Sequence, residues 1–200
     1  MYDMKKERSY WEGTGAANRR IMYIAAGYQN NDILKKPHIG IANTFFEGSP
    51  GTAHLRTLAE NVKKGIWMAG GMPMEFGVPA TCGNMATGSD GLRYELALRD
   101  IVAMSIESVV KIHKLDGLVI MASCDNIIAG AYLAALRVHI PCIVVTGGIM
   151  AAGSYCGKAL VQADIDVAAI RGDKEMLDIV QEHVCPSFGA CPSMGTACTM

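Results

Sequence analysis

The sequence predicts an α/β fold, in which a parallel or mostly parallel sheet carries helices on both faces. Segments typical of strands alternate with segments typical of helices along the chain. The strand-like segments are continuously apolar, which is typical of strands covered on both faces. The clearest unit, at residues 117–148, has the order strand, helix, strand, with lengths that fit a right-handed parallel crossover.

Two helices and one strand are expected in the first half of the chain. Residues 16–26 have helical character, and Pro37 interrupts the chain before a short buried strand at 39–43. Residues 55–68 are amphipathic, with apolar side chains close to helical spacing. We expect this second helix to end at the sequence GGMP, residues 70–73.

The second half of the chain begins with a long helix, which we expect over residues 98–113. A strand at 117–123, a helix at 129–139 and a strand at 141–148 follow it. Four apolar residues mark the expected buried side of the long helix: Ile101, Met104, Val109 and Ile112.

Length and composition indicate one soluble domain and exclude several classes of protein. The chain has 200 residues, of which 18% are charged, and its formal net charge is −1. No basic excess is present to bind a nucleic-acid backbone. The longest apolar stretches, such as 140–145, are far shorter than the roughly 20 residues of a membrane helix. Residues 1–13 lack the apolar core of a secretory signal, so we expect a cytoplasmic protein without nucleic-acid or membrane partners.

Seven cysteines are many for such a chain, and their number is odd. Without an export signal a disulfide framework is not expected, because cytosolic thiols usually stay reduced. Reduced cysteines serve either as small core residues or as ligands of soft metals. For any single cysteine the core interpretation comes first.

Cys124 and Asp125 follow the expected strand at 117–123 directly. In a parallel α/β sheet the carboxyl ends of the strands form the edge where ligands bind. A thiolate is a soft ligand suited to iron, and a carboxylate is a hard ligand suited to magnesium. The pair can serve two different metals, or the cysteine can simply be buried.

Two further cysteine-containing loops are candidates for chemistry. Cys191 lies just before an expected helix at 192–200, where backbone N–H groups lower the pKa of a thiol. The cysteine spacing in 185–200 matches neither zinc-binding pairs nor the common ferredoxin motifs. The Gly-rich loop 81–91 contains Cys82 but matches no phosphate-binding motif, and a turn before a helix is its plainer interpretation.

Several long motifs, in this order, resemble the dihydroxy-acid dehydratase and 6-phosphogluconate dehydratase family. The resemblance covers nearly the whole chain and corresponds to the N-terminal portion of the family's cluster-binding domain, here residues 1–200. It is carried by KPHIGIANTFFEGSPGTAHL (36–55), AGGMPMEF (69–76), GSDGLRYELALRDIVAMSIE (88–107), SCDNIIAGAYLAALRVHIPCIVVTGGIMAAG (123–153) and CPSFGACPSMGTACTM (185–200).

The resemblance implies a hydro-lyase that converts a 2,3-dihydroxy carboxylic acid into a 2-keto acid. In the family an iron–sulfur cluster acts as Lewis acid on the departing C3 hydroxyl, and a magnesium ion binds the substrate carboxylate and C2 oxygen. Cluster ligation maps onto Cys124 and Cys191, and a magnesium carboxylate maps onto Asp125. The catalytic base comes from the family's C-terminal domain, so no catalytic base is expected in this chain.

Three departures from the family pattern concern the metals. Gly51 stands where members with a [2Fe–2S] cluster have cysteine, which favours a [4Fe–4S] cluster. Asn126 stands where the family has a lysine that is carbamylated to bind magnesium, and the amide oxygen of asparagine is a weaker ligand. The loop that usually reads DDG or SDG reads Cys82-Gly83-Asn84. We therefore expect weakened Mg²⁺ binding and a cluster held by Cys82, Cys124 and Cys191, with simple packing of Cys82 as the alternative.

The resemblance also shapes what we expect of the whole protein. The C-terminal domain is absent from this sequence, so the chain alone is expected to be inactive. A partner chain can supply that domain in a split enzyme, and the family implies a homodimer. A degenerate paralogue that serves as a redox-sensing or scaffolding subunit is the alternative. Branched-chain dihydroxy acids, sugar acids and 6-phosphogluconate all remain open as substrates.

Overall fold

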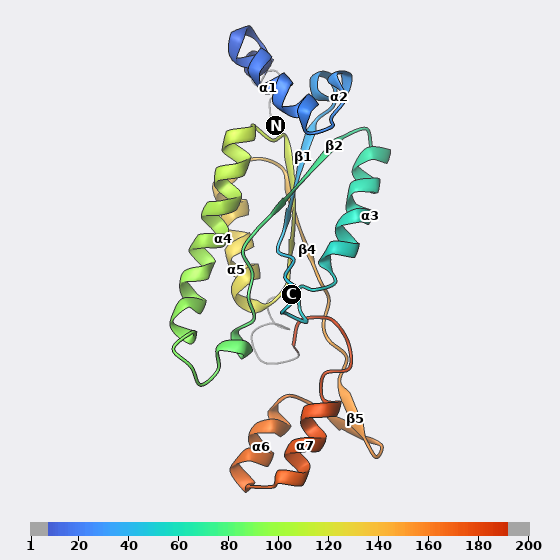
Figure 1. Cartoon of the computed structure of the whole chain (residues 1–200), viewed down its shortest axis with the longest axis vertical. Coiled ribbons are helices and arrows are strands. Elements are labelled where there is room, and N and C mark those ends of the chain that lie inside the picture. Colours follow the sequence, from blue (N-terminus) through green and yellow to red (C-terminus); the bar gives the residue numbers. More distant parts are fainter. Residues whose placement is uncertain (1–7, 192–200) are drawn as a thin grey trace.

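A four-stranded parallel sheet forms the centre of the computed structural model, which describes residues 8–191. Its strand order is β2-β1-β3-β4, and every neighbouring pair is parallel (Figure 1). The predicted parallel sheet is therefore confirmed. The strands are β1 (His38–Asn43), β2 (Met72–Gly77), β3 (Gly117–Ala122) and β4 (Cys142–Thr146).

Helices cover both faces of this sheet, as predicted. The helix α3 (Leu55–Met68) lies on one face, and α4 (Leu92–His113) and α5 (Asp125–Val138) lie together on the other (Figure 1). The α3 face has a small core of Ile41, Leu55, Ala59 and Met121. The larger core belongs to the α4–α5 face and includes Val102, Ile106, Ile120 and Ile128.

A short helical segment lies at the opposite end of the sheet from the carboxyl ends of the strands (Figure 1). It consists of the 3₁₀ turn η1 (Arg8–Trp11) and the helices α1 (Gly13–Ala25) and α2 (Asn30–Lys35). The rings of Trp11 and Tyr23 pack edge-on or tilted against each other and against His38, which begins β1. These aromatic contacts fix the segment to the amino end of the sheet.

A second, smaller unit follows β4 and lies beyond the carboxyl edge of the sheet (Figure 1). It contains an antiparallel hairpin, β5 (Gly153–Tyr155) and β6 (Lys158–Leu160), and the helices α6 (Ala163–Arg171) and α7 (Lys174–His183). Leu160, Val180 and Val184 form its own apolar cluster, separate from the sheet's two cores.

Element boundaries differ from the sequence prediction at informative places. Strand β2 was missed, because Pro73 and the preceding glycines suggested only a helix end. Proline is tolerated there because β2 is an edge strand of the sheet. Helix α5 begins at Asp125, earlier than the predicted 129, so the Cys124–Asp125 pair lies at the helix start itself. The expected helix at 192–200 lies outside the described residues.

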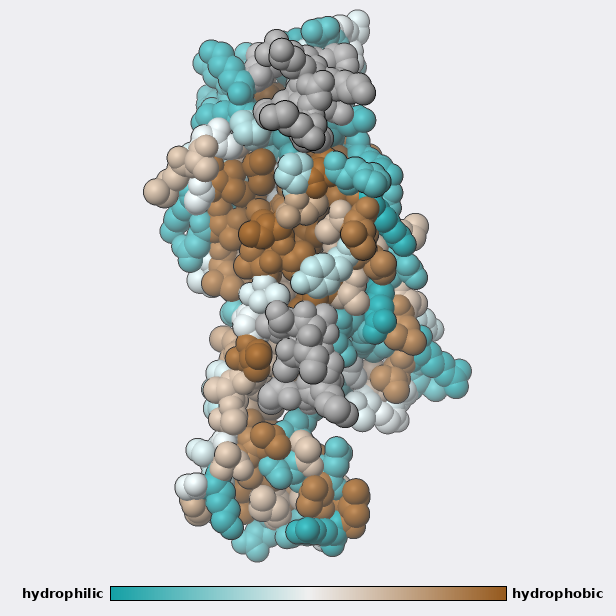
Figure 2. Space-filling model, turned by 180° about the vertical axis from the view of Figure 1, so that it is seen from behind, coloured by the Kyte–Doolittle hydropathy of each residue, from teal (hydrophilic) through white to brown (hydrophobic). Residues whose placement is uncertain are grey.

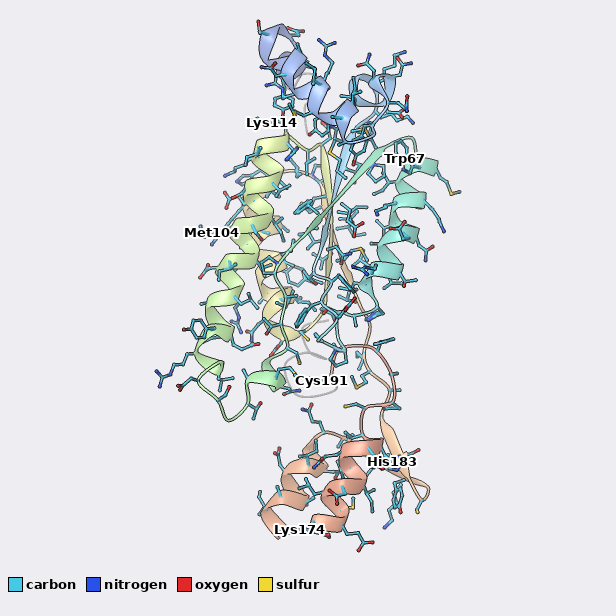
Figure 3. The ribbon with its side chains drawn as sticks, viewed as in Figure 1. Trp67, Met104, Lys114, Lys174, His183 and Cys191 are labelled. Atoms are coloured by element: carbon cyan, nitrogen blue, oxygen red, sulfur yellow. The ribbon has the colours of Figure 1, made fainter. Side chains whose placement is uncertain are left out.

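The predicted buried side of α4 was wrong. Ile101, Met104 and Ile112 are 49%, 60% and 68% exposed, and Met104 lies on the outer side of the helix (Figure 3). These apolar residues do share one face of the helix, but no other part of the described chain covers that face. The buried stripe follows helical spacing along other residues: Glu95, Leu98, Val102, Ala103, Ile106 and Val110.

Apolar surface also extends over the side of the sheet unit shown in Figure 2. Exposed apolar side chains occur on α5 and on the edge strand β4, among them Leu136 and Ile143. Among residues 8–191, no helix has both the length and the apolar character that crossing a membrane requires.

Candidate functional site

The candidate site lies at the carboxyl ends of β1 and β3, which finish at the same level. Asn43, the last residue of β1, pairs with Met121 near the end of β3. Just beyond, the Thr44 hydroxyl donates to the Met121 carbonyl oxygen at 3.0 Å. This bond holds the two strand ends together where the chain turns from β3 into α5.

Cys124 stands at this turn in an unusual backbone conformation. Its φ of 70° and ψ of 150° fall in a region that glycine adopts and other residues rarely do. The residue is the N-cap of α5, and its carbonyl oxygen accepts the first helical hydrogen bond, from Ile128 N–H at 3.0 Å. Such a conformation costs about 1–3 kcal/mol and concentrates at functional sites. It aims a buried thiol into the space above the sheet edge.

Gly51 approaches this thiol so closely that no side chain fits between them. A Cβ atom at position 51 would lie 2.9 Å from Cys124 Sγ and 3.6 Å from Ser123 Oγ. Ser123 is fully buried, and its hydroxyl has no hydrogen-bond partner among the described residues. A buried hydroxyl without a partner is costly, so this spot favours an additional polar group beside the thiol.

Cys82 meets Cys124 from the loop that follows β2. The two sulfurs share a hydrogen bond, which lowers the pKa of Cys82 to about 6. Backbone N–H groups of the short 3₁₀ turn η2 (Gly83–Ala86) lower the Cys82 pKa further, against the opposing effect of burial. The pKa of Cys124 is raised, first by the same hydrogen bond and then by burial. The two sulfurs therefore share one proton, which stays on Cys124 and leaves Cys82 as the thiolate.

Cys191 reaches the same place through a loop held on two sides. Gly189 N–H donates to the Pro50 carbonyl oxygen at 3.0 Å, and Ala190 N–H donates to that of Gly148 at 2.9 Å. Gly189 has φ of 131°, and a Cβ there would lie 2.6 Å from the backbone nitrogen of Met150. Only glycine at position 189 allows the loop to lie this close to the segment that follows β4. The loop places Cys191 at the sheet edge (Figure 3).

A pocket of about 370 Å³ brings the three cysteines together. Cys82, Cys124 and Cys191 all line it, although they come from three distant parts of the sequence. No disulfide joins any of the six cysteines within the described residues, and Cys185 and Cys156 are exposed. Across residues 8–191, no three His, Cys, Asp or Glu side chains are arranged around one point that could hold a single metal ion.

The predicted magnesium residues lie in the wall of this pocket as well. Asp125 and Asn126 open α5, and the Asp125 carboxylate accepts a hydrogen bond from Asn126 N–H at 2.9 Å. The side-chain amide of Asn126 is held on both sides. Its oxygen accepts from Arg99 Nε at 2.7 Å, and its NH₂ group donates to the Glu95 carboxylate.

Glu95 and Arg99 are site residues that the sequence prediction missed. Both come from the first two turns of α4, and Glu95 is only 7% exposed. Glu95 occupies the buried stripe of α4 at helical spacing from Leu98 and Val102. A carboxylate at a core position of an amphipathic helix was the available signal, but it was hidden because the buried face of α4 was assigned wrongly.

Comparison with known proteins agrees with this geometry. The family model described as dihydroxy-acid/6-phosphogluconate dehydratase N-terminal matches residues 36–200. The chain belongs to this family. The predicted resemblance is confirmed over the part that contains all the pocket residues described above.

Relatives within the family include archaeal and bacterial proteins named dihydroxy-acid dehydratase. The one from Methanobrevibacter smithii is 42% identical over 194 residues, and that from Halothermothrix orenii is 41% identical over 194 residues. A relative from Pyrococcus abyssi is 40% identical over 194 residues. Each match covers 94% of this chain but only 35% of the relative, so the chain spans about a third of the length of these dehydratases.

Proposed function

We propose that this chain is the cluster-binding portion of an iron–sulfur dehydratase that converts a 2,3-dihydroxy carboxylic acid into a 2-keto acid. The observation that carries the proposal is the meeting of Cys82, Cys124 and Cys191 in one pocket at the sheet edge. The names of the relatives support the reaction class.

The donor set fits an iron–sulfur cluster better than a single metal ion. Cluster ligands are thiolates, and the pocket offers three of them on separate segments. Cys82, Cys124 and Cys191 would hold such a cluster, which would supply Lewis acidity toward a substrate hydroxyl. Gly51 provides no fourth thiol. Because it has no Cβ atom, which would lie 2.9 Å from Cys124 Sγ, it leaves the space beside this sulfur open.

The chain's own residues prepare this pocket in two ways. The low pKa of Cys82 presents a thiolate at neutral pH, which is the form that binds iron. The unusual backbone conformation of Cys124 places its thiol in the pocket wall, and the glycine at position 51 leaves the space beside this sulfur free of a side chain. The base that removes the C2 proton is expected from the family's C-terminal portion, which also fits the exposed apolar residues on α4, α5 and β4.

A non-catalytic paralogue is the second candidate, because Gly83 and Asn126 replace two charged magnesium ligands of the family. Such a protein would keep the fold and use the cluster for redox sensing or scaffolding. The two candidates differ in one result. The chain is combined with the C-terminal portion of a relative, either as a separate partner chain or within a homodimer. Only a dehydratase then gains activity on a 2,3-dihydroxy acid.

The deciding experiment is anaerobic reconstitution of the purified chain, followed by measurement of iron, acid-labile sulfide and the EPR spectrum after reduction. We expect a stoichiometric cluster with a [4Fe–4S] signal. The variants Cys82→Ser, Cys124→Ser and Cys191→Ser should each lose most of the iron. The exposed Cys156→Ser is the matched control and should load as the wild type does.

Two outcomes contradict the proposal. A folded wild-type chain that takes up no iron would leave the three thiols as packing residues. Full iron content in Cys82→Ser, with an unchanged EPR spectrum, would remove Cys82 from the ligand set and return it to a structural role.

A further inference from the structure

Ser123 carries a buried hydroxyl that the fold leaves without a partner. The residue connects the end of β3 to Cys124, the N-cap of α5, and it is fully buried. Within residues 8–191 its Oγ atom makes no hydrogen bond. A buried hydroxyl without a partner is costly, and each such group in a folded protein needs an explanation.

A second buried hydroxyl at the same sheet edge is satisfied. Thr44 follows β1 and is fully buried as well, and its Oγ1 atom donates to the Met121 carbonyl oxygen at 3.0 Å. The edge can therefore satisfy a hydroxyl from within the fold. The missing partner of Ser123 is a property of its particular position.

The Ser123 hydroxyl borders the spot beside Gly51, and so does the Cys124 thiol. A Cβ atom at position 51 would lie 2.9 Å from Cys124 Sγ, 3.6 Å from Ser123 Oγ and 3.7 Å from the Cα atom of Ala190. Ala190 directly precedes Cys191, so one pocket thiol and the neighbour of a second surround this spot. The hydroxyl therefore lies beside the sulfurs of the candidate cluster site.

We propose that Ser123 donates a hydrogen bond to a sulfur of the bound cluster beside Gly51 and thereby raises the reduction potential of the cluster. The inference rests on the proposed function, because a cluster has to be present. A neutral thiol is a weak hydrogen-bond acceptor, whereas a metal-bound cysteine is a thiolate and a charged acceptor. Cluster binding thus supplies the partner that the cluster-free fold does not offer to this hydroxyl.

The direction of the effect follows from charge. Reduction adds one electron to a group whose sulfurs already carry negative charge. A hydrogen bond donated to one of these sulfurs stabilises the more negative, reduced state, so the potential rises. Loss of the donor should therefore lower the potential while the three thiols stay in place.

The experiment compares the wild-type chain with Ser123→Ala after anaerobic reconstitution. Iron and acid-labile sulfide are measured first, and the EPR signal of the reduced cluster is then followed in a dithionite titration with redox mediators. We expect Ser123→Ala to bind as much iron as the wild type and to be reduced at a more negative potential. Ser105→Ala makes the same change in α4, where the hydroxyl donates to the Val102 carbonyl oxygen at 2.9 Å, and should leave the potential unchanged.

Urea denaturation of the cluster-free chains separates this role from a structural one. Ser123→Ala removes a polar atom that has no partner, so we expect this variant to be at least as stable as the wild type. Thr44→Val removes a satisfied hydroxyl at the same edge and should lower the free energy of unfolding. A residue that only supported the fold would behave as Thr44 does and would leave the potential unchanged.

Three results would overturn the inference and leave the proposed cluster standing. One is an unchanged potential in Ser123→Ala at full iron content, which would leave the hydroxyl to a buried water molecule. Another is a cluster-free Ser123→Ala chain as destabilised as Thr44→Val, which would show a partner within the fold. The third is loss of iron from Ser123→Ala alone, because a donor that only adjusts the potential leaves ligation intact. A wild-type chain that takes up no iron overturns the proposed function and this inference with it.

Discussion

Cys82 and Cys124 share one proton, and this pairing has a measurable consequence in the cluster-free chain. The hydrogen bond from Cys124 lowers the pKa of Cys82 to about 6, from an ordinary value of 9.0. Cys82 should therefore be a thiolate at neutral pH, while Cys124 stays protonated. We expect the ultraviolet absorbance of one thiolate to appear with a midpoint near 6, and to be absent in Cys82→Ser. A first thiolate that appears only near 9 would contradict this assignment.

His38 makes the stability of the fold depend on pH. The ring is buried, and burial lowers its pKa from 6.5, against the opposing effects of the Ile33 carbonyl at 2.8 Å and of Asp116. The nearby His113 lowers the pKa further. In the folded chain His38 is therefore neutral, and the unfolded chain takes up its proton first.

The sign of this effect follows from the order of proton uptake. Because the unfolded state binds more protons just below pH 6.5, the free energy of unfolding falls as the pH drops through that value. We expect His38→Gln, which keeps an amide donor for Ile33, to flatten the slope of stability against pH in this range. Urea denaturation at a series of pH values measures the slope. An unchanged slope would show that other groups dominate.

Some of the site could be predicted from sequence because it is local. Cys124 and Asp125 follow an apolar strand, so the topology alone places them at the ligand-binding edge. Glu95 could not be placed in the same way. Its role depends on the rotation of α4 about its own axis, which is set by contacts with α5 and not by the pattern of α4 itself.

At the scale of elements, the α4–α5 contact controls the acidic side of the pocket. The two helices approach so closely at Gly130 that a Cβ there would lie 2.8 Å from the Arg99 carbonyl oxygen and from Val102 Cβ. Both Arg99 and Asn126 depend on this spacing, because their hydrogen bond bridges the two helices. The close approach also explains why α4 buries a different stripe from the one predicted.

Gly130→Ala should destabilise the chain, whereas the same change at Gly65 should not. Overpacking at Gly130 forces the helices apart, at a cost of about 1–3 kcal/mol. Gly65 lies on the exposed side of α3 with nothing within 4 Å of its Cβ position. There alanine should stabilise by about 0.5–1 kcal/mol, since it lowers the entropy of the unfolded chain. Urea denaturation compares the two variants, and equal effects would contradict the packing argument.

Predictability also varied between elements for physical reasons. Helix α3 was predicted with its observed bounds, Leu55–Met68, because its amphipathic pattern matches the face that it buries. Strand β2 carries a proline and two strand-breaking glycines before it, and only pairing with β1 identifies it as a strand. The local sequence pattern is sufficient to predict an element that packs one apolar face on one core. It is insufficient for an edge strand that is identified only by its pairing with a neighbouring strand.

At the scale of the whole molecule, the described chain has a sheet unit and a smaller unit with separate cores. Leu160, Val180 and Val184 pack among themselves, and the loop 185–191 connects this cluster to the sheet edge. Separate cores favour separate local opening. Cys191 lies at the end of the connecting loop, so the stability of the smaller unit bears on the candidate cluster site.

Hydrogen exchange followed by mass spectrometry should reveal this separation. Val180→Ala leaves a cavity that should lower the free energy of unfolding of the smaller unit by about 2 kcal/mol. We expect this variant to exchange faster in α6 and α7, while α4 and α5 keep their protection. Ile106→Val in the main core is the converse control and should affect α4 and α5. Uniform acceleration in both variants would show one cooperative unit in place of two.

Cluster loading should couple the two units, because Cys191 follows α7 closely in the chain and lines the pocket of the sheet unit. Binding to the folded state alone stabilises whatever must be ordered for binding. A cluster ligated by Cys191 restrains the loop 185–191, so exchange in α7 should slow on iron loading in the wild type. Cys191→Ser should lose this effect, whereas Cys156→Ser, in the hairpin of the same unit, should keep it. Identical exchange in α7 with and without the cluster would contradict Cys191 as a ligand, even if the chain contained iron.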